Sequence, residues 1–204
     1  MNKTSPPRLE RLAEADFPTE FGRFRIYGYR TAPEGGAPVE EGVALAMGDL
    51  SGDPPPLVRI HSQCLTGDVF HSLRCDCRAQ LEIAIESIAA EGRGLLIYEC
   101  QEGRGIGLLN KLRAYELQDQ GADTVEANQR LGFDTDLRRY ALPGLVLRDF
   151  GLRAIRLLSN NPEKVEAVEN AGVCVTERVP CLAEVLETRR GYLRTKKEKM
   201  GHLL

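Results

Sequence analysis

Three cysteines, Cys64, Cys75 and Cys77, lie in the segment RIHSQCLTGDVFHSLRCDC, residues 59–77. Thiolate sulfur is a soft ligand that favours Zn²⁺. Because one residue separates Cys75 from Cys77, both can face one point from a bend, and Cys64 can complete a third corner. Three protein ligands leave a fourth position for water, whose pKa then falls to about 7. The spacing therefore predicts a catalytic rather than a structural zinc site.

Two other interpretations of this segment stay open. The three cysteines can be free thiols near a junction of strand and helix, since apolar cores tolerate Cys. His61 and His71 are close enough in the sequence to supply a fourth ligand, although a histidine in such a place is more often a satisfied polar group.

A second candidate segment, QEGRGIGLLNKLRAY, spans residues 101–115. Its three alternating glycines precede an expected helix, where exposed backbone N–H groups bind phosphate well. Arg104 and Lys111 add positive charge. The same pattern also fits an ordinary turn before a helix, and it is neither a Walker loop nor a dinucleotide fingerprint.

Two shorter segments could also carry chemistry. In DTDLRRY, residues 134–140, Asp136 and Arg138 could form an acid–base and anion-binding pair, or simply begin a charged helix. In SNNPEKV, from residue 159, Lys164 stands in the first turn of an expected helix. It could contact a phosphate there, and a plain capped helix start explains the segment equally well.

Alternating strands and helices must position these residues. The patterns predict strands at 21–30, 43–48, 57–61, 94–99, 154–159 and 173–179, and helices at 78–91, 106–120, 137–150 and 162–170. This order predicts an α/β fold, with a mixed sheet flanked by helices and the zinc site at a loop and helix start. We expect one compact catalytic domain over residues 21–204, preceded by a loosely held N-terminal arm over residues 1–20.

The composition narrows the functional class. The 204 residues carry 27 Lys and Arg against 30 Asp and Glu, a net charge of −3, so neither a disordered nor a collagen-like chain is indicated. The slight acidity and 6% aromatic content argue against a nucleic-acid partner. The sequence shows no apolar run of membrane-spanning length and no signal-peptide core, which predicts a cytoplasmic protein without a membrane partner. The basic stretch 189–199 is interpreted as a solvated helix face.

Taken in order, RIHSQCLTGD, SLRCDC, QEGRGIGLLNKLRAYELQDQG, DTVEANQRLGF and LLSNNPEKV closely resemble GTP cyclohydrolase II, an enzyme of riboflavin biosynthesis. The C-terminal TKKEKMGHLL also fits, so the resemblance runs from about residue 10 to residue 204. It implies a homodimer with one Zn²⁺ per subunit and Mg²⁺ with the triphosphate. The implied reaction opens the imidazole ring of GTP at carbon 8 and releases formate and pyrophosphate. The remaining product is 2,5-diamino-6-(ribosylamino)pyrimidin-4-one 5′-phosphate, in the first step of the pathway.

The resemblance also implies roles for individual residues. Asp136 matches the proposed proton acceptor, Arg138 the proposed nucleophile or α-phosphate ligand, and Tyr115 a tyrosine beside the purine ring. The metal ligands are Cys64, Cys75 and Cys77. The GTP-contacting positions are Arg59, Ile60, His61, Ser62, Gln63, Gln80, Glu102, Gly103, Arg104, Thr124, Ser159 and Lys164.

The chain departs from the family pattern in three places. Gln63 stands where the family usually has Glu, which removes a charge close to the metal. Ser159 replaces the usual Thr and keeps a hydroxyl. The segment after Pro180 lacks an Asn-rich stretch and carries Cys181.

Three alternatives stay open: an enzyme acting on a related purine nucleotide, one that stops at the formamide, or a zinc-stabilised nucleotide- or RNA-binding module without turnover. The sequence leaves open whether Arg138 forms a covalent bond.

Overall fold

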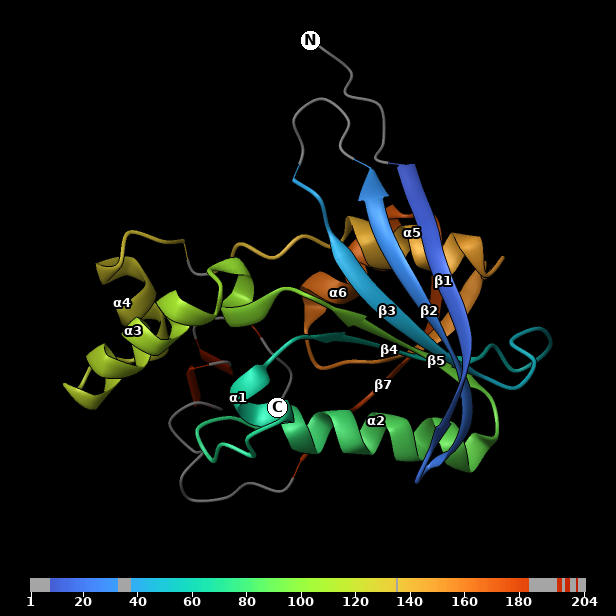
Figure 1. The fold of residues 1–204 in the computed structure, drawn as a ribbon, viewed down its shortest axis with the longest axis horizontal. Helices are drawn as coiled ribbons and strands as arrows, with labels where there is room; N and C mark the ends of the chain where they lie inside the picture. Colours follow the sequence, from blue (N-terminus) through green and yellow to red (C-terminus); the bar gives the residue numbers. More distant parts are fainter. Residues whose placement is uncertain are drawn as a thin grey trace, which may run out of the picture.

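The computed structural model describes residues 8–32, 38–134, 136–183, 194–195, 197–198 and 201. One seven-stranded sheet organises them, in the order β1-β2-β3-β5-β4-β6-β7 (Figure 1). The strands are β1 (Arg8–Thr19), β2 (Gly22–Ala32), β3 (Glu41–Met47), β4 (Leu57–Ser62), β5 (Gly94–Glu99), β6 (Ala154–Leu158) and β7 (Cys174–Val179). The helices are α1 (Leu65–Asp68), α2 (Cys77–Glu91), the 3₁₀ helix η1 (Glu102–Gly105), α3 (Leu108–Asp119), α4 (Thr124–Arg130), α5 (Ala141–Asp149) and α6 (Pro162–Asn170).

The sheet is mixed, and this confirms the predicted α/β fold. Strands β1, β2 and β3 form an antiparallel meander, and β3 pairs antiparallel with β5. Strands β5, β4, β6 and β7 then run parallel to their neighbours. Parallel neighbours need crossover connections, which the helices supply. The carboxyl ends of the parallel strands consequently lie along one edge of the sheet.

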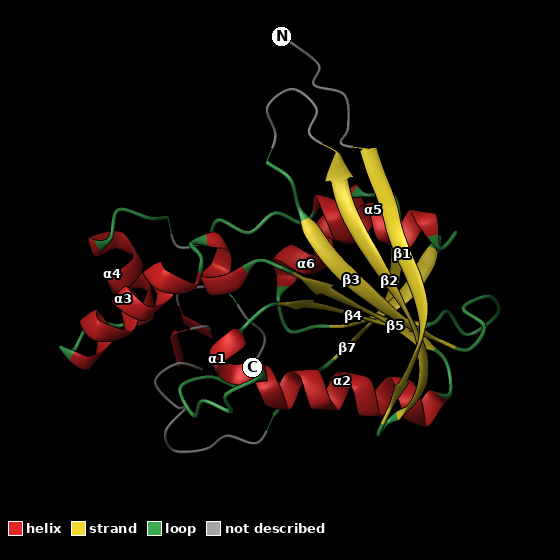
Figure 2. Ribbon diagram, viewed as in Figure 1, coloured by secondary structure: helices red, strands yellow, loops and turns green. Residues whose placement is uncertain are grey.

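Helices cover both faces of the sheet (Figure 2). Helix α2 packs on one face, where Ala84 and Ile88 meet Leu96 of β5. Helices α5 and α6 pack on the other face, where Leu142 and others meet Ile97 of β5. Strand β5 is therefore apolar along most of its length, as expected for a strand covered on both sides. Its last residue, Glu99, is a fully buried exception.

The prediction of a loosely held arm over residues 1–20 is wrong for Arg8–Thr19, which form strand β1 along the edge of the sheet. This strand pairs with β2 from Arg8 to Thr19, with one register shift between Arg11 and Ala13. Prolines suggested a loose segment, but Pro18 lies near the end of an edge strand, where a missing N–H is tolerated. Cross-strand ion pairs such as Arg30–Glu10, with 2.7 Å between Nη2 and Oε2, add local attraction.

One helix prediction also needs correction, and two short helices were missed. The expected helix 137–150 begins only at Ala141, and the preceding residues that carry Arg138 have no regular structure. The short helices α1 and α4 were not predicted. Helix α4 begins at a capping box, in which the Asp123 side chain accepts from the backbone N–H groups of Val125 and Glu126, and the Glu126 side chain accepts from the backbone N–H of Asp123. Such a box can be recognised in the sequence DTVE, where the apolar pattern is too short to show a helix.

Helices α3 and α4 form a hairpin that extends away from the sheet (Figure 1). The small alanine cluster Ala114, Ala122 and Ala127 lies at the centre of this hairpin. Most of the basic stretch 189–199 lies outside the described residues. Among the helices that the structure describes, none has the length and apolar character required to cross a bilayer.

Candidate functional site

A pocket of about 1090 Å³, partly open to solvent, lies where strands β4, β5 and β6 end. Ligands of α/β proteins bind at such carboxyl edges because loops and helix starts converge there. Strand β4 brings Arg59, His61 and Ser62, the chain after β5 brings residues 101–104, and the chain after β6 brings Ser159. The predicted GTP-contacting residues at the pocket wall are Arg59, His61, Ser62, Gln63, Gln80, Glu102, Gly103, Arg104, Thr124, Ser159 and Lys164.

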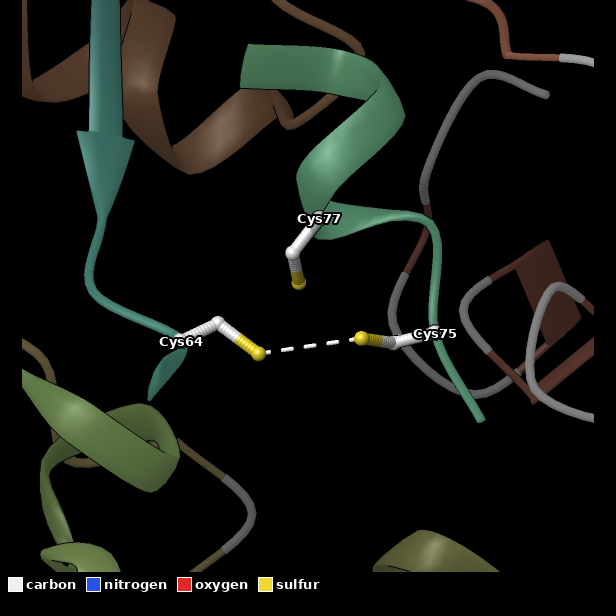
Figure 3. A group of neighbouring side chains, drawn as sticks. All are labelled: Cys64, Cys75 and Cys77. Carbon is white, nitrogen blue, oxygen red and sulfur yellow. Dashed lines mark hydrogen bonds between the residues drawn. The ribbon is translucent and has the colours of Figure 1, made fainter. Parts of the chain in front are cut away.

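Three sulfur atoms meet at one side of this pocket (Figure 3). The Sγ atoms of Cys64, Cys75 and Cys77 all lie within 4.8 Å of one another, and those of Cys64 and Cys75 are 3.6 Å apart. Sulfur ligands 2.3 Å from a tetrahedral zinc ion stand about 3.8 Å apart. The donor set and its spacing therefore fit a metal ion of this kind.

Gly67 in helix α1 allows the chain to pass close to the sulfur cluster. A Cβ atom at this position would lie 2.9 Å from Sγ of Cys75 and 3.1 Å from Sγ of Cys64. Both distances are too short for van der Waals contact between carbon and sulfur. The glycine is thus required by close approach, and its replacement would push the sulfur atoms apart.

Lys111 and Glu102 connect the sulfur cluster to helix α3. The Lys111 ammonium donates to Sγ of Cys64 at 3.1 Å and to Oε1 of Glu102 at 2.7 Å. The other oxygen of Glu102 accepts from the backbone N–H of Leu65, at the start of α1, at 2.6 Å. Hydrogen bonds from the neighbouring thiols, together with Lys111, lower the pKa of Cys64. Hydrogen bonding to Cys64 in turn raises the pKa of Cys75 to about 11.

Asp68 fixes the backbone at Cys64 from the other side. Its carboxylate accepts from the Cys64 N–H at 3.0 Å and from the Tyr98 hydroxyl at 2.8 Å, and it also lies 3.2 Å from Nε2 of His61. Burial lowers the pKa of His61, so its ring is neutral at pH 7. Among the described residues, neither His61 nor His71 joins the sulfur cluster. The cluster therefore has three protein ligands.

Positive charge lines another part of the pocket. Both terminal nitrogens of Arg104 are buried and have no hydrogen-bond partner among the described residues. By contrast, Lys164 donates to the Ile60 carbonyl at 2.8 Å, and Arg59 donates to the Leu158 carbonyl at 2.9 Å and to Gln80 at 2.8 Å. A buried guanidinium without partners is costly unless an anion pairs with it. Arg104 therefore marks a place for an anionic group.

Asp136 and Arg138 form a close pair beside the pocket. The Asp136 carboxylate accepts from the backbone N–H of Arg138 at 3.0 Å and from its Nε at 2.9 Å, and also from Nη2. Burial tends to raise the pKa of Asp136, but the hydrogen bonds and charge of Arg138 outweigh it and lower the pKa. Arg138 lines the pocket, whereas Asp136 and Ile60 do not. Asp136 is thus ionised, and its carboxylate is already paired with the guanidinium of Arg138.

Tyr115 lies on helix α3 and faces the metal side of the pocket. Its hydroxyl is 3.1 Å from Oγ1 of Thr66, and the guanidinium of Arg74 lies 4.8 Å from its ring centroid. The hydroxyl of Thr66 is in turn 3.8 Å from Sγ of Cys64. These contacts place an aromatic ring close to the sulfur cluster, where a planar group could stack.

Several pocket residues were not singled out from the sequence. Asn160 is one of them, and its side chain exchanges two hydrogen bonds with the backbone of Cys181, of 2.7 and 3.0 Å. This pair docks the segment after Pro180 beside the pocket, where sequence reasoning left the local loop open. The doublet of asparagines before Pro162 was the available signal. The others are Arg74, Gln101, Ile106, Ala114, Gln118, Asn128 and Asn161.

Comparison with known proteins gives a consistent result. The profile of the GTP cyclohydrolase II family matches residues 10–180. GTP cyclohydrolase-2 of Yersinia pseudotuberculosis is 53% identical over 197 residues, which cover 97% of this chain and 98% of that protein. Riboflavin biosynthesis protein RibBA of Bacillus subtilis is 54% identical over 197 residues, 96% of this chain and 48% of that protein. The chain thus spans about half the length of its RibBA relatives.

Proposed function

The chain belongs to the GTP cyclohydrolase II family, and from this premise we propose that it opens the imidazole ring of GTP at carbon 8. The products are formate, pyrophosphate and 2,5-diamino-6-(ribosylamino)pyrimidin-4-one 5′-phosphate, the start of riboflavin biosynthesis. One observation carries the proposal beyond the family match. A cluster of three thiols that could hold a metal ion shares a pocket with Arg104, whose two buried terminal nitrogens have no hydrogen-bond partner among the described residues.

We propose Zn²⁺ as the resident metal, one per subunit, held by Cys64, Cys75 and Cys77. When bound through three thiolates, zinc supplies a site for a water molecule of lowered pKa, which can attack an electron-poor carbon. The chain's own contribution is to hold the ligands. Asp68 fixes the backbone at Cys64, and Lys111 compensates the negative charge of its thiolate.

The cationic residues bind the triphosphate in this proposal, with Mg²⁺ carried on the phosphates. Arg104 pairs with a phosphate oxygen through its two free nitrogens. Arg138 lies beside the α-phosphate and stabilises the negative charge that develops as pyrophosphate leaves. Asp136 holds the guanidinium of Arg138 in place, which is the role its geometry favours over that of a free proton acceptor.

The base of GTP occupies the metal side of the pocket. We propose that Tyr115 packs beside the purine ring, and that Gln63 and Gln80 contact its polar edge. Holding carbon 8 at the metal replaces a random encounter with a fixed geometry, which accounts for much of the rate that enzymes gain. Apart from Ile60, which does not line the pocket, the remaining residues predicted to contact GTP keep their proposed roles.

A homodimer and a cytoplasmic setting also belong to the proposal. The homodimer is proposed from the family resemblance, and exposed apolar side chains such as Phe70 and Leu109, 71% and 75% exposed, are available to a subunit interface. A cluster of reduced thiols needs a reducing compartment, which supports the cytoplasm. Because Gln63 stands where the family has Glu, two alternatives stay open. The substrate could be a related purine nucleotide, or the reaction could stop at the formamide product.

The test is direct. Zinc-loaded protein is incubated with GTP and Mg²⁺, and formate and pyrophosphate are measured together. We expect both products in equal amounts, and we expect Cys75→Ser to abolish formate release. Cys174→Ser, the same change at an exposed cysteine on β7, serves as the matched control and keeps full activity. Pyrophosphate without formate, or GTP binding without either product, would contradict the assigned reaction.

A further inference from the structure

Glu99 is the last residue of strand β5 and is completely buried. It belongs to none of the roles assigned so far. Its Oε2 accepts from the Ser62 hydroxyl at 3.2 Å, and its Oε1 accepts from the side-chain amide of Gln101 at 3.0 Å. Both oxygens are thus used by polar groups at the carboxyl ends of β4 and β5. Burying a carboxylate costs free energy, so the presence of Glu99 at this fully buried position points to a role in the site.

The side-chain amide of Gln101 makes two hydrogen bonds to the backbone of Arg139, the residue after Arg138. Its Nε2 donates to the carbonyl of Arg139 at 2.5 Å, and its Oε1 accepts from the backbone N–H of Arg139 at 2.7 Å. The second hydrogen of Nε2 goes to Glu99. If the amide were turned over, its oxygen would face the carboxylate and both backbone hydrogen bonds would be lost. Glu99 therefore dictates the orientation in which Gln101 can hold Arg139.

Glu99 also reaches the side chain of Arg138. The Ser62 hydroxyl donates to Glu99, and the same oxygen lies 3.4 Å from Nη1 of Arg138. Arg138 and Lys164 both act electrostatically on Glu99, although burial outweighs them and raises its pKa to about 7. The carboxyl group of Glu99 thus lies near Arg138 and Lys164, two cations that line the pocket, but Glu99 itself does not line the pocket.

The segment that carries Arg138 depends on such outside contacts, because it has no regular secondary structure. Its described attachments to the body are few. The N–H of Leu137 donates to the Arg104 carbonyl at 3.0 Å, and Gln101 holds the backbone of Arg139. Leu137 and Arg139 are the two neighbours of Arg138 in the sequence, and the contact at Arg139 is the one that Glu99 orients through Gln101.

We propose that Glu99 is a positioning residue for Arg138, which it places in the pocket through the Ser62 hydroxyl and the Gln101 amide. The inference rests on the proposed function, because Arg138 is there assigned to the phosphate groups. Glu99 itself touches no substrate in this arrangement. Its effect on the reaction passes through the place and orientation of one guanidinium.

The variant Glu99→Asp tests this proposal, because it keeps the carboxyl group and draws it back by one methylene group. Neither Ser62 nor Gln101 can then be held at its present distance. We expect kcat/KM for GTP to fall on the order of tenfold to a hundredfold, as is typical when a reacting group is misplaced by about 1 Å. The matched control is Glu40→Asp, the same shortening at a half-buried carboxylate that holds Leu142 but contacts neither Ser62 nor Gln101; we expect its kcat/KM to stay within about twofold of the wild type.

A double-mutant cycle separates positioning from a merely structural role. If Glu99 acts through Arg138, the loss caused by Glu99→Asp disappears in the Arg138→Lys background. An equal loss in both backgrounds, or an unchanged kcat/KM in the single variant, overturns the proposal. A crystal structure of Glu99→Asp gives a readout independent of turnover: Arg138 should be displaced, whether or not GTP is the substrate. An unmoved Arg138 would overturn the positioning role and leave the proposed function standing.

Discussion

The metal side and the cationic side of the pocket are built in different ways. Cys64, Cys75 and Cys77 all come from residues 59–77, and a short helix with Gly67 at its centre brings their sulfur atoms together. The cationic side is assembled from the ends of three strands and from an irregular segment around Arg138. One half of the site is thus encoded locally, and the other half exists only in the folded protein.

This difference predicts that the two sides can be disabled separately. Metal binding depends on a few nearby ligands, whereas phosphate binding depends on buried cations held by distant parts of the chain. Damage to the first should stop chemistry and leave GTP binding, and damage to the second should weaken GTP binding and leave the metal.

Removal of the metal has the largest expected effect. Chelation should lower GTP turnover by more than about a hundredfold, beyond the effect typical of losing an outer-shell partner. The sulfur cluster lies outside the two large apolar clusters that join the sheet to its helices, so the metal-free protein should still unfold in one cooperative transition. Calorimetric titration with GTP should show nearly unchanged affinity. A chain that unfolds when zinc is stripped would instead indicate the structural, non-catalytic alternative.

The reciprocal experiment replaces Arg104 by Gln. A hydrogen bond to a charged group contributes about 1.5–3 kcal/mol, so the KM for GTP should rise about tenfold to a hundredfold. The zinc content should not change. Because two nitrogens of this guanidinium are buried without a hydrogen-bond partner among the described residues, the variant should be as stable as the wild type or more so.

Comparison with a second variant makes this result specific. Arg74→Gln removes a guanidinium that also lines the pocket but already binds Asp119 at 2.6 Å. Its KM should stay within about threefold of the wild-type value, since exposed ion pairs contribute about 1 kcal/mol or less. If Arg104→Gln left KM unchanged while Arg74→Gln raised it, the phosphate site would lie on the metal side, and the division of the pocket would be wrong.

The same contrast explains what could be predicted from the sequence. The sulfur cluster followed from the spacing of Cys64, Cys75 and Cys77, and the alternating strands and helices gave the mixed sheet. The contacts of Arg138 did not follow, because Ser62, Gln101 and Arg138 meet only when β4 and β5 lie side by side. Strand β1 was missed for a related reason: its pattern is polar, and its pairing with β2 depends on a partner strand rather than on its own apolar content.

Glu99 offers the finest test of this comparison, because its burial should make folding depend on pH. Burial raises its pKa to about 7 from an ordinary value near 4.5. Between these values the folded protein binds a proton that the unfolded chain has released, so stability falls as pH rises through this window and levels off above it. The total change should be up to about 3 kcal/mol. In Glu99→Gln this contribution should vanish from urea unfolding curves measured between pH 5 and pH 8.

Glu40→Gln is the matched control for this pH dependence. Burial also raises the pKa of Glu40, but to a smaller extent because the N–H of Leu142 donates to its carboxylate. Glu40→Gln should therefore remove only a small part of the slope. An unchanged slope in Glu99→Gln would mean that Lys164 and Arg138 keep Glu99 ionised in the folded protein. The carboxylate would then be a full counter-ion on the cationic side, and that side would carry less net positive charge than its arginines and lysine suggest.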